Sequence, residues 1–173
     1  MNVGLARYAE WITVWSDVQT HLPRLFAHSH GTVLELGVRA GVSTAALLAG
    51  VEVVGGTVWS VDRDDCSPLF AGNPQWRFVQ ADSLDEHALD AAGLPASLDL
   101  LFIDTEHTAD RTARELAMWG TRVRCGGVIY LHDTDDPATM PGVRDAMEAY
   151  CRERGIVPIY HAGSYGLGEI RPC

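Results

Sequence analysis

The stretch TVLELGVRAGVS, residues Thr32–Ser43, constrains the fold of this chain most strongly because its physical character changes twice within one short segment. Thr32–Leu36 is a short, largely apolar run of the kind that forms a buried strand of a parallel sheet. Gly37 and Gly41 then bracket a tight turn, and Ser43 or the residue after it can cap a following helix. The stretch predicts strand, glycine loop and helix. In an open α/β sheet, this junction directs backbone N–H groups at the rim where ligands bind.

Composition restricts the partners that such a protein can have. The chain has 173 residues, of which 47% are hydrophobic and 21% charged, and it contains no long uncharged apolar run. These values are typical of one soluble globular domain, so we expect no membrane as a partner. The formal net charge of -10 would repel a phosphate backbone, which argues against nucleic acid. A small molecule or a cation is the expected ligand.

The cysteines show no metal-binding or disulfide pattern in the sequence. Cys66, Cys125, Cys151 and Cys173 are scattered and form no CxxC spacing. No signal peptide precedes the first predicted helix. We therefore expect reduced thiols and a cytoplasmic location.

The first thirty residues have helical periodicity. Apolar residues recur at steps of three and four over 5–26, which predicts one amphipathic helix that Pro23 bends or divides. Aromatic residues at this spacing usually pack into a core, and this is the expected role of Trp11 and Trp15. A contact with the substrate or with a second subunit stays open, so this segment is also where a homo-oligomer would form.

The rest of the chain alternates between strand and helix patterns, as one domain spanning 1–173. Further parallel strands are expected at 57–61, 76–80, 98–103 and 128–131, and helices at 44–49, 84–92 and 109–124. A helix whose inward face carries Val143 and Met147 follows, and strands at 156–160 and 165–170 are too close for a helical crossover. Gly126 and Gly127 are expected to turn the chain into the fifth strand. The pattern predicts a Rossmann-like, doubly wound α/β fold whose seven strands are mostly parallel, with a C-terminal antiparallel hairpin and an added N-terminal helix.

Aspartates end several of the predicted strands. Asp62, Asp82, Asp104 and Asp133 each follow an apolar run. One such residue is more often a helix cap, but the carboxyl ends of parallel strands meet at one rim of the sheet. We therefore expect these four side chains to line a single cleft.

The glycine spacing argues against a nicotinamide cofactor. ELGVRAG lacks the first two glycines of the GxGxxG fingerprint, which allow close approach to a pyrophosphate. The chain also lacks a Ser-Tyr-Lys hydride-transfer set and contains no lysine. Asp62, at the end of the second strand, is well placed to accept hydrogen bonds from two ribose hydroxyls. A nicotinamide-dependent oxidoreductase is thus the weaker alternative.

Together these segments resemble the class I S-adenosylmethionine-dependent methyltransferases. ELGVRAG looks like the first motif of that family, VWSVD its ribose-binding strand and FVQADS the segment beside the adenine. The resemblance implies S-adenosyl-L-methionine as the cofactor. It assigns to the cofactor site Glu35, Gly37, Val38, Arg39, Gly41, Ser43, Asp62, Arg63, Asp82, Ser83 and Asp104.

The resemblance also implies individual roles for these residues. Gly37 and Gly41 would flank the methionine end of the cofactor, and Asp82 with Ser83 would approach the adenine. Glu35 would orient the loop or meet the methionine amino group through water. A strand-end carboxylate that binds backbone amides is the alternative role for Glu35.

The second half of the chain is similar to a narrower group. FIDTEHTADRTARELAMW followed by GGVIYLHDT resembles the small-molecule O-methyltransferases related to the macrocin and cephalosporin-tailoring enzymes. That resemblance implies a divalent metal bound by Asp104 and Asp133, with His132 adjacent. Oxygen ligands suit Mg²⁺, but His132 stands where relatives often have a carboxylate or amide, and imidazole favours another divalent cation.

His107 follows Asp104 by three residues and should overhang the same cleft. A histidine there can take a proton at neutral pH, so we expect His107, with Asp104, to form the catalytic pair. The predicted reaction is in-line attack of a small-molecule hydroxyl on the sulfonium methyl group. A non-catalytic S-adenosylmethionine-binding protein is the alternative function, and the sequence does not identify the acceptor.

Overall fold

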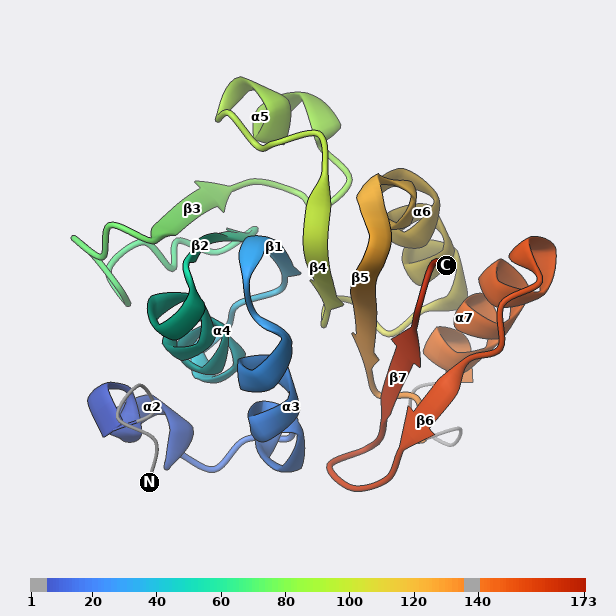
Figure 1. The fold of residues 1–173 in the computed structure, drawn as a ribbon, viewed down its shortest axis with the longest axis horizontal. Coiled ribbons are helices and arrows are strands. Elements are labelled where there is room, and N and C mark those ends of the chain that lie inside the picture. The colour runs from blue at the N-terminus through green and yellow to red at the C-terminus, as the bar shows by residue number, and fades with distance from the viewer. Residues whose placement is uncertain (1–5, 136–140) are drawn as a thin grey trace.

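A computed structural model of the chain describes residues 6–135 and 141–173, and its centre is a seven-stranded sheet (Figure 1). The strands are β1 (Gly31–Leu36), β2 (Gly56–Asp62), β3 (Trp76–Gln80), β4 (Leu98–Ile103), β5 (Val123–His132), β6 (Ile159–His161) and β7 (Leu167–Ile170). Their order across the sheet is β3-β2-β1-β4-β5-β7-β6. β1 to β5 are parallel, whereas β7 runs antiparallel to both β5 and β6. The predicted fold class is confirmed.

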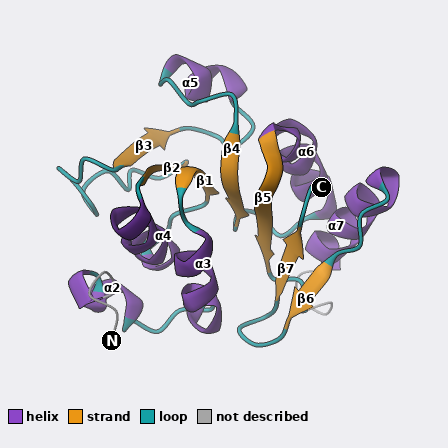
Figure 2. Ribbon diagram, viewed as in Figure 1, coloured by secondary structure: helices purple, strands orange, loops and turns teal. Residues whose placement is uncertain are grey.

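Helices cover both faces of the sheet (Figure 2). They are α2 (Ala9–Ile12), α3 (Leu22–His28), α4 (Val42–Val54), α5 (Glu86–Ala91), α6 (Ala109–Trp119) and α7 (Pro141–Arg154), with short 3₁₀ turns at Gln19–His21 and Gly120–Arg122. Side chains of α3 and α4 share one hydrophobic core with one face of β1, β2, β4 and β5. Side chains of α5, α6 and α7 share a second core with the opposite face. The two-residue alternation of each strand divides its apolar side chains between these cores.

The junction of β1 and α4 has the predicted order but a different cap. Gly41, with a φ of 77°, is the residue before α4, and no side chain caps the helix there. Ser43 and Thr44 turn their hydroxyls inward to the Glu35 carboxylate, so the capping role predicted for them is wrong. Gly37 is required by close approach, because a Cβ there would lie 1.9 Å from the Asp104 carbonyl oxygen.

The predicted N-terminal helix is interrupted. α2 and α3 are separated by an irregular segment, 13–18, and by a 3₁₀ turn. Pro23 lies at the start of α3, where its missing N–H costs no hydrogen bond, so the break occurs before the proline. Because the segment is irregular, helical spacing does not determine which of its side chains are buried.

β5 is longer than predicted because Gly126 and Gly127 lie inside the strand. The register between β4 and β5 shifts between Leu98 and Leu100, beside these glycines. A Cβ at Gly127 would lie 2.8 Å from the Asp99 carbonyl oxygen. The glycines therefore accommodate a bulge within the strand, and the prediction that they form a turn before it is wrong.

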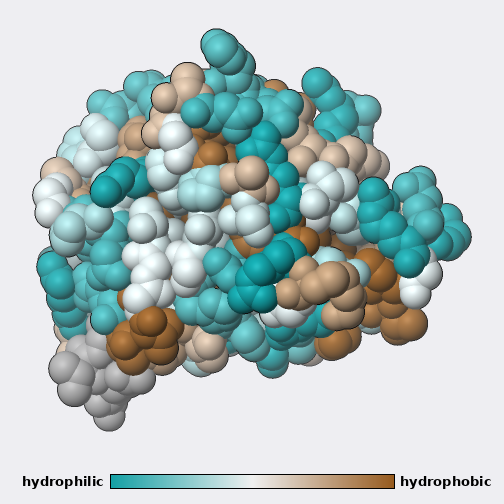
Figure 3. All heavy atoms as spheres, turned by 45° about the horizontal axis from the view of Figure 1, so that its top comes forward, coloured by the Kyte–Doolittle hydropathy of each residue, from teal (hydrophilic) through white to brown (hydrophobic). Residues whose placement is uncertain are grey.

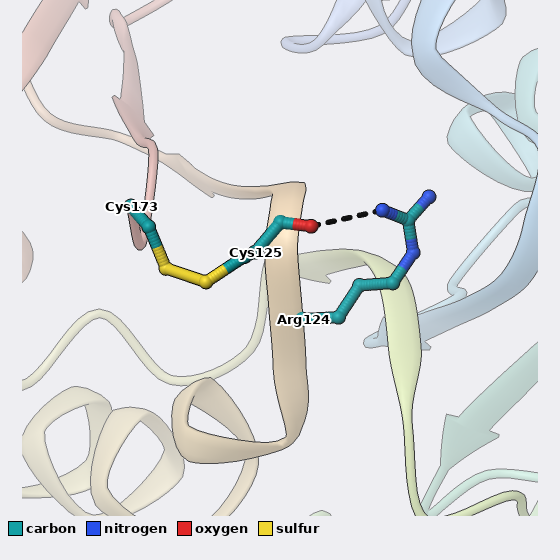
Figure 4. The surroundings of a disulfide bond; sticks show 3 residues. All are labelled: Arg124, Cys125 and Cys173. Carbon is teal, nitrogen blue, oxygen red and sulfur yellow. Dashed lines mark hydrogen bonds between the residues drawn. A yellow bond between two sulfur atoms is a disulfide. The ribbon is translucent and has the colours of Figure 1, made fainter.

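The expectation of four reduced thiols is wrong for two of them. Cys125 and Cys173 form a disulfide with a Cα–Cα distance of 5.1 Å (Figure 4). β7 runs antiparallel to β5 with Ile129 opposite Ile170, and the same register extended would bring Cys173 beside the start of β5. Strand pairing thus joins residues that are 48 positions apart in the sequence. Cys66 and Cys151 are buried free thiols.

Among the described residues, no helix is both long enough and apolar enough to cross a bilayer. On the face shown in Figure 3, strongly hydrophobic residues form small separate groups among hydrophilic ones.

Candidate functional site

Two pockets adjoin at the carboxyl ends of β1, β2 and β4. We name them the Asp62 pocket and the Trp15 pocket after a residue that lines each. Residues lining both are Gly37, Val38, Arg39, Asp104 and Thr105. The glycine loop and the end of β4 therefore form the boundary at which molecules in the two pockets would meet.

Asp62 anchors the glycine loop. Its Oδ2 accepts hydrogen bonds from the backbone N–H groups of Val38 (2.8 Å) and Arg39 (3.1 Å), and Oδ1 accepts one from Asp64 (3.0 Å). Burial opposes ionisation, but these N–H donors outweigh it and lower the pKa of Asp62. Arg39 adopts a φ of 51°, a left-handed conformation that the hydrogen bond to Asp62 helps to hold. The predicted placement of Asp62 in the cleft is observed.

Glu35 lies below the loop and lines neither pocket. Its fully buried carboxylate accepts hydrogen bonds from three hydroxyls, those of Ser43 (2.7 Å), Thr44 (2.8 Å) and Ser60 (2.6 Å). Burial dominates over these donors and raises the pKa of Glu35 to about 7. Glu35 therefore ties β1, β2 and the start of α4 together through hydroxyls, rather than through the backbone amides considered above.

The pKa of Glu35 predicts a pH-dependent stability. Because its pKa is near 7 when folded and 4.5 in the reference state, its contribution is fully present below pH 4.5 and lost as the pH rises through 7. The free energy of unfolding of the wild type should fall by up to about 3 kcal/mol relative to Glu35→Gln between pH 4.5 and 8. Urea unfolding of both proteins across this pH range measures the difference in free energy. A constant difference would show that Glu35 ionises normally.

The adenine side of the predicted site differs from expectation. The Asp82 carboxylate faces Arg111, with an Nη2–Oδ1 distance of 2.6 Å, and Arg63, with an Nε–Oδ2 distance of 3.4 Å, and it does not line the Asp62 pocket. Ser83 lines the pocket, but its hydroxyl donates to Glu115. Arg63 does line the pocket, as predicted.

A buried ionic network on α6 was missed by sequence reasoning. Glu115 is fully buried and accepts hydrogen bonds from Thr105 (2.9 Å), Arg111 Nε (3.1 Å) and Ser83. Burial raises its pKa, and the donors oppose this effect. The network joins the loops after β3 and β4 that line the Asp62 pocket. The spacing of Arg111 and Glu115, one helical turn apart, was the available signal.

Two histidines and two aspartates meet beside the shared boundary. His107 Nε2 lies 2.8 Å from Asp133 Oδ2 and 3.4 Å from Asp104 Oδ1. His132 Nδ1 lies 2.9 Å from the same Asp133 oxygen and 3.5 Å from Asp104 Oδ1. The sequence prediction that these residues converge at the ends of β4 and β5 is correct.

The four groups shift one another's pKa values. Hydrogen bonds to Asp104 and Asp133 raise the pKa of His107 to about 9. For His132, burial of the ring acts in the opposite direction, but the same carboxylates outweigh it and raise the pKa to about 10. The histidines in turn lower the pKa values of both carboxyls against the effect of burial. At neutral pH, two imidazolium ions therefore balance two carboxylates.

The chemistry of this cluster suits a divalent cation. One ligand atom each from Asp104, His107 and Asp133 can be chosen so that all three lie within 4.8 Å of one another. A mixed oxygen and nitrogen donor set accommodates Mg²⁺ less well than Mn²⁺ or Zn²⁺. The sequence prediction named His132 in place of His107 as the nitrogen donor. Residues 136–140 of the predicted acidic loop lie outside the described residues.

The two tryptophans of the N-terminal segment differ in environment. Trp11 packs against Phe70 with ring centroids 4.7 Å apart, as predicted. Trp15 is 79% exposed and lines the Trp15 pocket, so the predicted core packing is wrong for this residue. The irregular segment that carries Trp15 explains the difference.

The doubly wound sheet, the glycine loop after β1 and the acidic residue ending β2 define a class I S-adenosylmethionine-dependent methyltransferase fold. The sequence profile of one family, described as a methyltransferase domain, matches residues 34–134. The chain belongs to this methyltransferase domain family.

Solved structures share this fold at low sequence identity. A protein from Corynebacterium glutamicum matches with a TM-score of 0.71 and 20% identity, covering 100% of this chain and 91% of its own. The MycE methyltransferase of the mycinamycin pathway, in complex with Mg, SAH and mycinamycin VI, matches with a TM-score of 0.68 and 18% identity, over 97% of this chain. The match spans 54% of MycE, about half its length. CalS11, a TDP-rhamnose 3'-O-methyltransferase, has a TM-score of 0.66 and 15% identity, with 97% and 92% coverage.

Proposed function

We propose that this protein transfers a methyl group from S-adenosylmethionine to a hydroxyl of a small molecule. The observation that carries the proposal is the pair of adjoining pockets, one beside the Asp62-anchored glycine loop and one beside His107. The cofactor would occupy the Asp62 pocket and the acceptor the Trp15 pocket. O-methyltransferases such as CalS11 share the fold, which supports oxygen as the acceptor atom.

Within the Asp62 pocket, the proposed contacts follow from chemistry. Asp62 Oδ2 already accepts two backbone hydrogen bonds and Oδ1 one, which leaves about one lone pair, on Oδ1, for a ribose hydroxyl. Gly37 lines the pocket and lets the backbone approach the methionine end, whereas Gly41, predicted for the same role, lines neither pocket. Acidic residues around the pocket would favour the positive sulfonium over the neutral thioether product. Arg63 and Arg111, which also line it, are paired with Asp82.

In the Trp15 pocket, His107 is proposed to take the acceptor proton in its neutral form, which is the minor form at neutral pH because Asp104 and Asp133 raise its pKa to about 9. Asp133 lies 2.8 Å from Nε2 and would orient the ring, in the way that a carboxylate orients a catalytic histidine. The protein otherwise holds the acceptor oxygen in line with the methyl group and excludes water. Asp104, at the boundary of the pockets, lies 3.4 Å from the same Nε2 atom, so both carboxylates would orient the ring and leave Nδ1 to take the proton.

A divalent cation fits the same cluster. Asp104 and Asp133 would hold it, with an imidazole nitrogen beside them, and Mg in the MycE complex supports this assignment. When bound, the cation would lower the pKa of the acceptor hydroxyl. In that state His107 Nε2 would hold the cation in place of its proton, so the cation rather than His107 would activate the hydroxyl.

The test is calorimetric titration of S-adenosylhomocysteine into the protein, with Mg²⁺ and again with EDTA. We expect micromolar binding in both conditions, because the cofactor contacts do not involve the cation. Asp62→Ala should weaken binding by about 10- to 100-fold, since it removes hydrogen bonds to a charged group. The control Asp65→Ala changes an exposed neighbouring carboxylate that does not line the pocket. No binding in either condition would contradict the proposed function.

Trp15 should recognise the acceptor. Loss of an aromatic surface at the pocket mouth should raise the acceptor KM of Trp15→Ala about tenfold and leave S-adenosylhomocysteine affinity unchanged. Trp15→Phe should retain most of the wild-type KM, and Val14→Ala, which alters an exposed neighbour that does not line the pocket, is the control. An unchanged KM together with a change in molar mass would instead indicate that Trp15 contacts a second subunit.

A further inference from the structure

His132 makes two contacts in opposite directions from one buried ring. It is the last residue of β5, and its side chain is 0% exposed. Nδ1 lies 2.9 Å from Asp133 Oδ2, and Nε2 lies 3.1 Å from the backbone carbonyl oxygen of Asp17. Because Nε2 donates its proton to that carbonyl, the ring has a fixed orientation between two parts of the chain.

The first contact holds a carboxylate in an unusual backbone conformation. Asp133 has a φ of 61°, in the left-handed region that few residues other than glycine adopt. This conformation turns its carboxylate back toward both histidines, so that one oxygen lies 2.8 Å from His107 and 2.9 Å from His132. His132 therefore helps to determine where Asp133 meets His107.

The second contact, from His132 Nε2 to the Asp17 carbonyl, lies at the segment that lines the Trp15 pocket. Residues 15–18 line this pocket but belong to the irregular segment, so helical hydrogen bonds do not fix them. Asp17 also forms an ion pair with Arg39 of the glycine loop, whose side chain is 83% exposed. An exposed ion pair contributes little, whereas the His132 bond is shielded from water.

We propose that His132 is a positioning residue that sets two sides of the acceptor site through separable contacts. Nδ1 places the Asp133 carboxylate against His107, and Nε2 places the segment that carries Trp15. In this role His132 is not a ligand of the cation. The inference rests on the proposed function only in treating the Trp15 pocket as the acceptor site.

Two variants of similar shape separate the contacts. His132→Asn places its amide nitrogen near the position of Nδ1, so it keeps the contact to Asp133 and loses the one to Asp17. His132→Gln can place its nitrogen near Nε2, so it keeps the contact to Asp17 and loses the one to Asp133. Asp17→Asn is the matched control, because it weakens the ion pair with Arg39 but leaves the Asp17 carbonyl in place.

Hydrogen exchange read by mass spectrometry measures both contacts without an acceptor. In His132→Asn, exchange should accelerate at 13–18 and stay unchanged at 133–135. In His132→Gln the pattern should reverse, and Asp17→Asn should change 13–18 less than His132→Asn does. With an acceptor, His132→Asn should raise KM about tenfold at nearly constant kcat, and His132→Gln should lower kcat about tenfold at nearly constant KM.

Three results would overturn the inference. The same exchange pattern in both variants, or failure of either variant to fold, would show that the ring acts as core packing. Equal loss of Mn²⁺ affinity in both variants with unchanged exchange would show that His132 is a cation ligand. Because the exchange pattern needs no cofactor, it stays informative if S-adenosylhomocysteine fails to bind.

Discussion

Replacing His107 with alanine should lower turnover by about 100- to 10,000-fold, the usual contribution of a general base. Affinity for S-adenosylhomocysteine should change less than about twofold, because His107 lines the Trp15 pocket and not the Asp62 pocket. The reason is that Asp104 and Asp133 fix the imidazole at the boundary where the two pockets adjoin. Single-turnover kinetics and calorimetry on the same preparation measure both effects.

A matched substitution separates this effect from a general loss of histidine. His87 is exposed on α5, away from both pockets, and His87→Ala should leave turnover unchanged. His107→Gln can place a hydrogen-bond donor near Nε2, toward the carboxylates, but cannot serve as a base near neutral pH. Unchanged turnover in His107→Ala would rule out the base role, and equal loss of cofactor affinity would point to a collapsed site.

Reduction of the disulfide should lower the free energy of unfolding by about 4 kcal/mol in the chain-entropy model. The bond closes a long loop, because Cys125 and Cys173 are 48 positions apart, and the loop contains α7, β6 and β7. Reduction increases the conformational entropy of the unfolded chain, because the disulfide restricts the unfolded state more than the folded one. Urea unfolding with and without dithiothreitol measures the difference.

The double variant Cys125→Ser, Cys173→Ser is the control for this experiment. Its stability should match that of the reduced wild type and should not respond to dithiothreitol. The buried thiols of Cys66 and Cys151 are present in both proteins, so they cancel in the comparison. Equal stability of the oxidised and reduced wild type would mean that other contacts restrict the unfolded chain even when the disulfide is reduced.

Both effects depend on the carboxyl-terminal third of the chain. β7 is paired with β5, and β5 carries Cys125 at one end and His132 at the other. The loop before β7 also reaches the N-terminal region, where the Gly163 carbonyl lies 2.7 Å from His21 Nε2. The packing of this region therefore affects the shape of the Trp15 pocket as well as the stability of the whole protein.

The sequence predicted the strand–helix alternation and the terminal hairpin because both follow from local patterns. Apolar runs bounded by glycine or aspartate are properties of a few consecutive residues, and the two-residue and 3.6-residue periods can be read directly. The meeting of Asp62 with Asp104 at one pocket, and of Asp104 with Asp133, was also predictable, since topology alone brings the carboxyl ends of parallel strands to one rim. The prediction that all four aspartates line a single cleft is wrong, because Asp82 and Asp133 line neither pocket. Element ends were less accurate, as the length of β5 shows.

What the sequence could not specify is the partner of each polar group. Asp82 and Ser83 follow the expected strand. Their side chains, however, form hydrogen bonds with Arg111 and Glu115 of α6. Trp15 has helical spacing but lies in an irregular segment and is exposed. For Asp82 and Ser83 the outcome depends on contacts with residues distant in the chain.

By itself, then, the sequence determined the order of secondary structure, the doubly wound sheet and the rim at which chemistry-bearing residues collect, because local periodicity and chain connectivity set these features. Only the tertiary structure decided that Glu35 is satisfied by hydroxyls, that Cys125 meets Cys173 and that His132 bridges Asp133 to Asp17. These pairings depend on packing distances of a few ångströms between segments far apart in sequence, and a one-dimensional pattern carries no record of such distances.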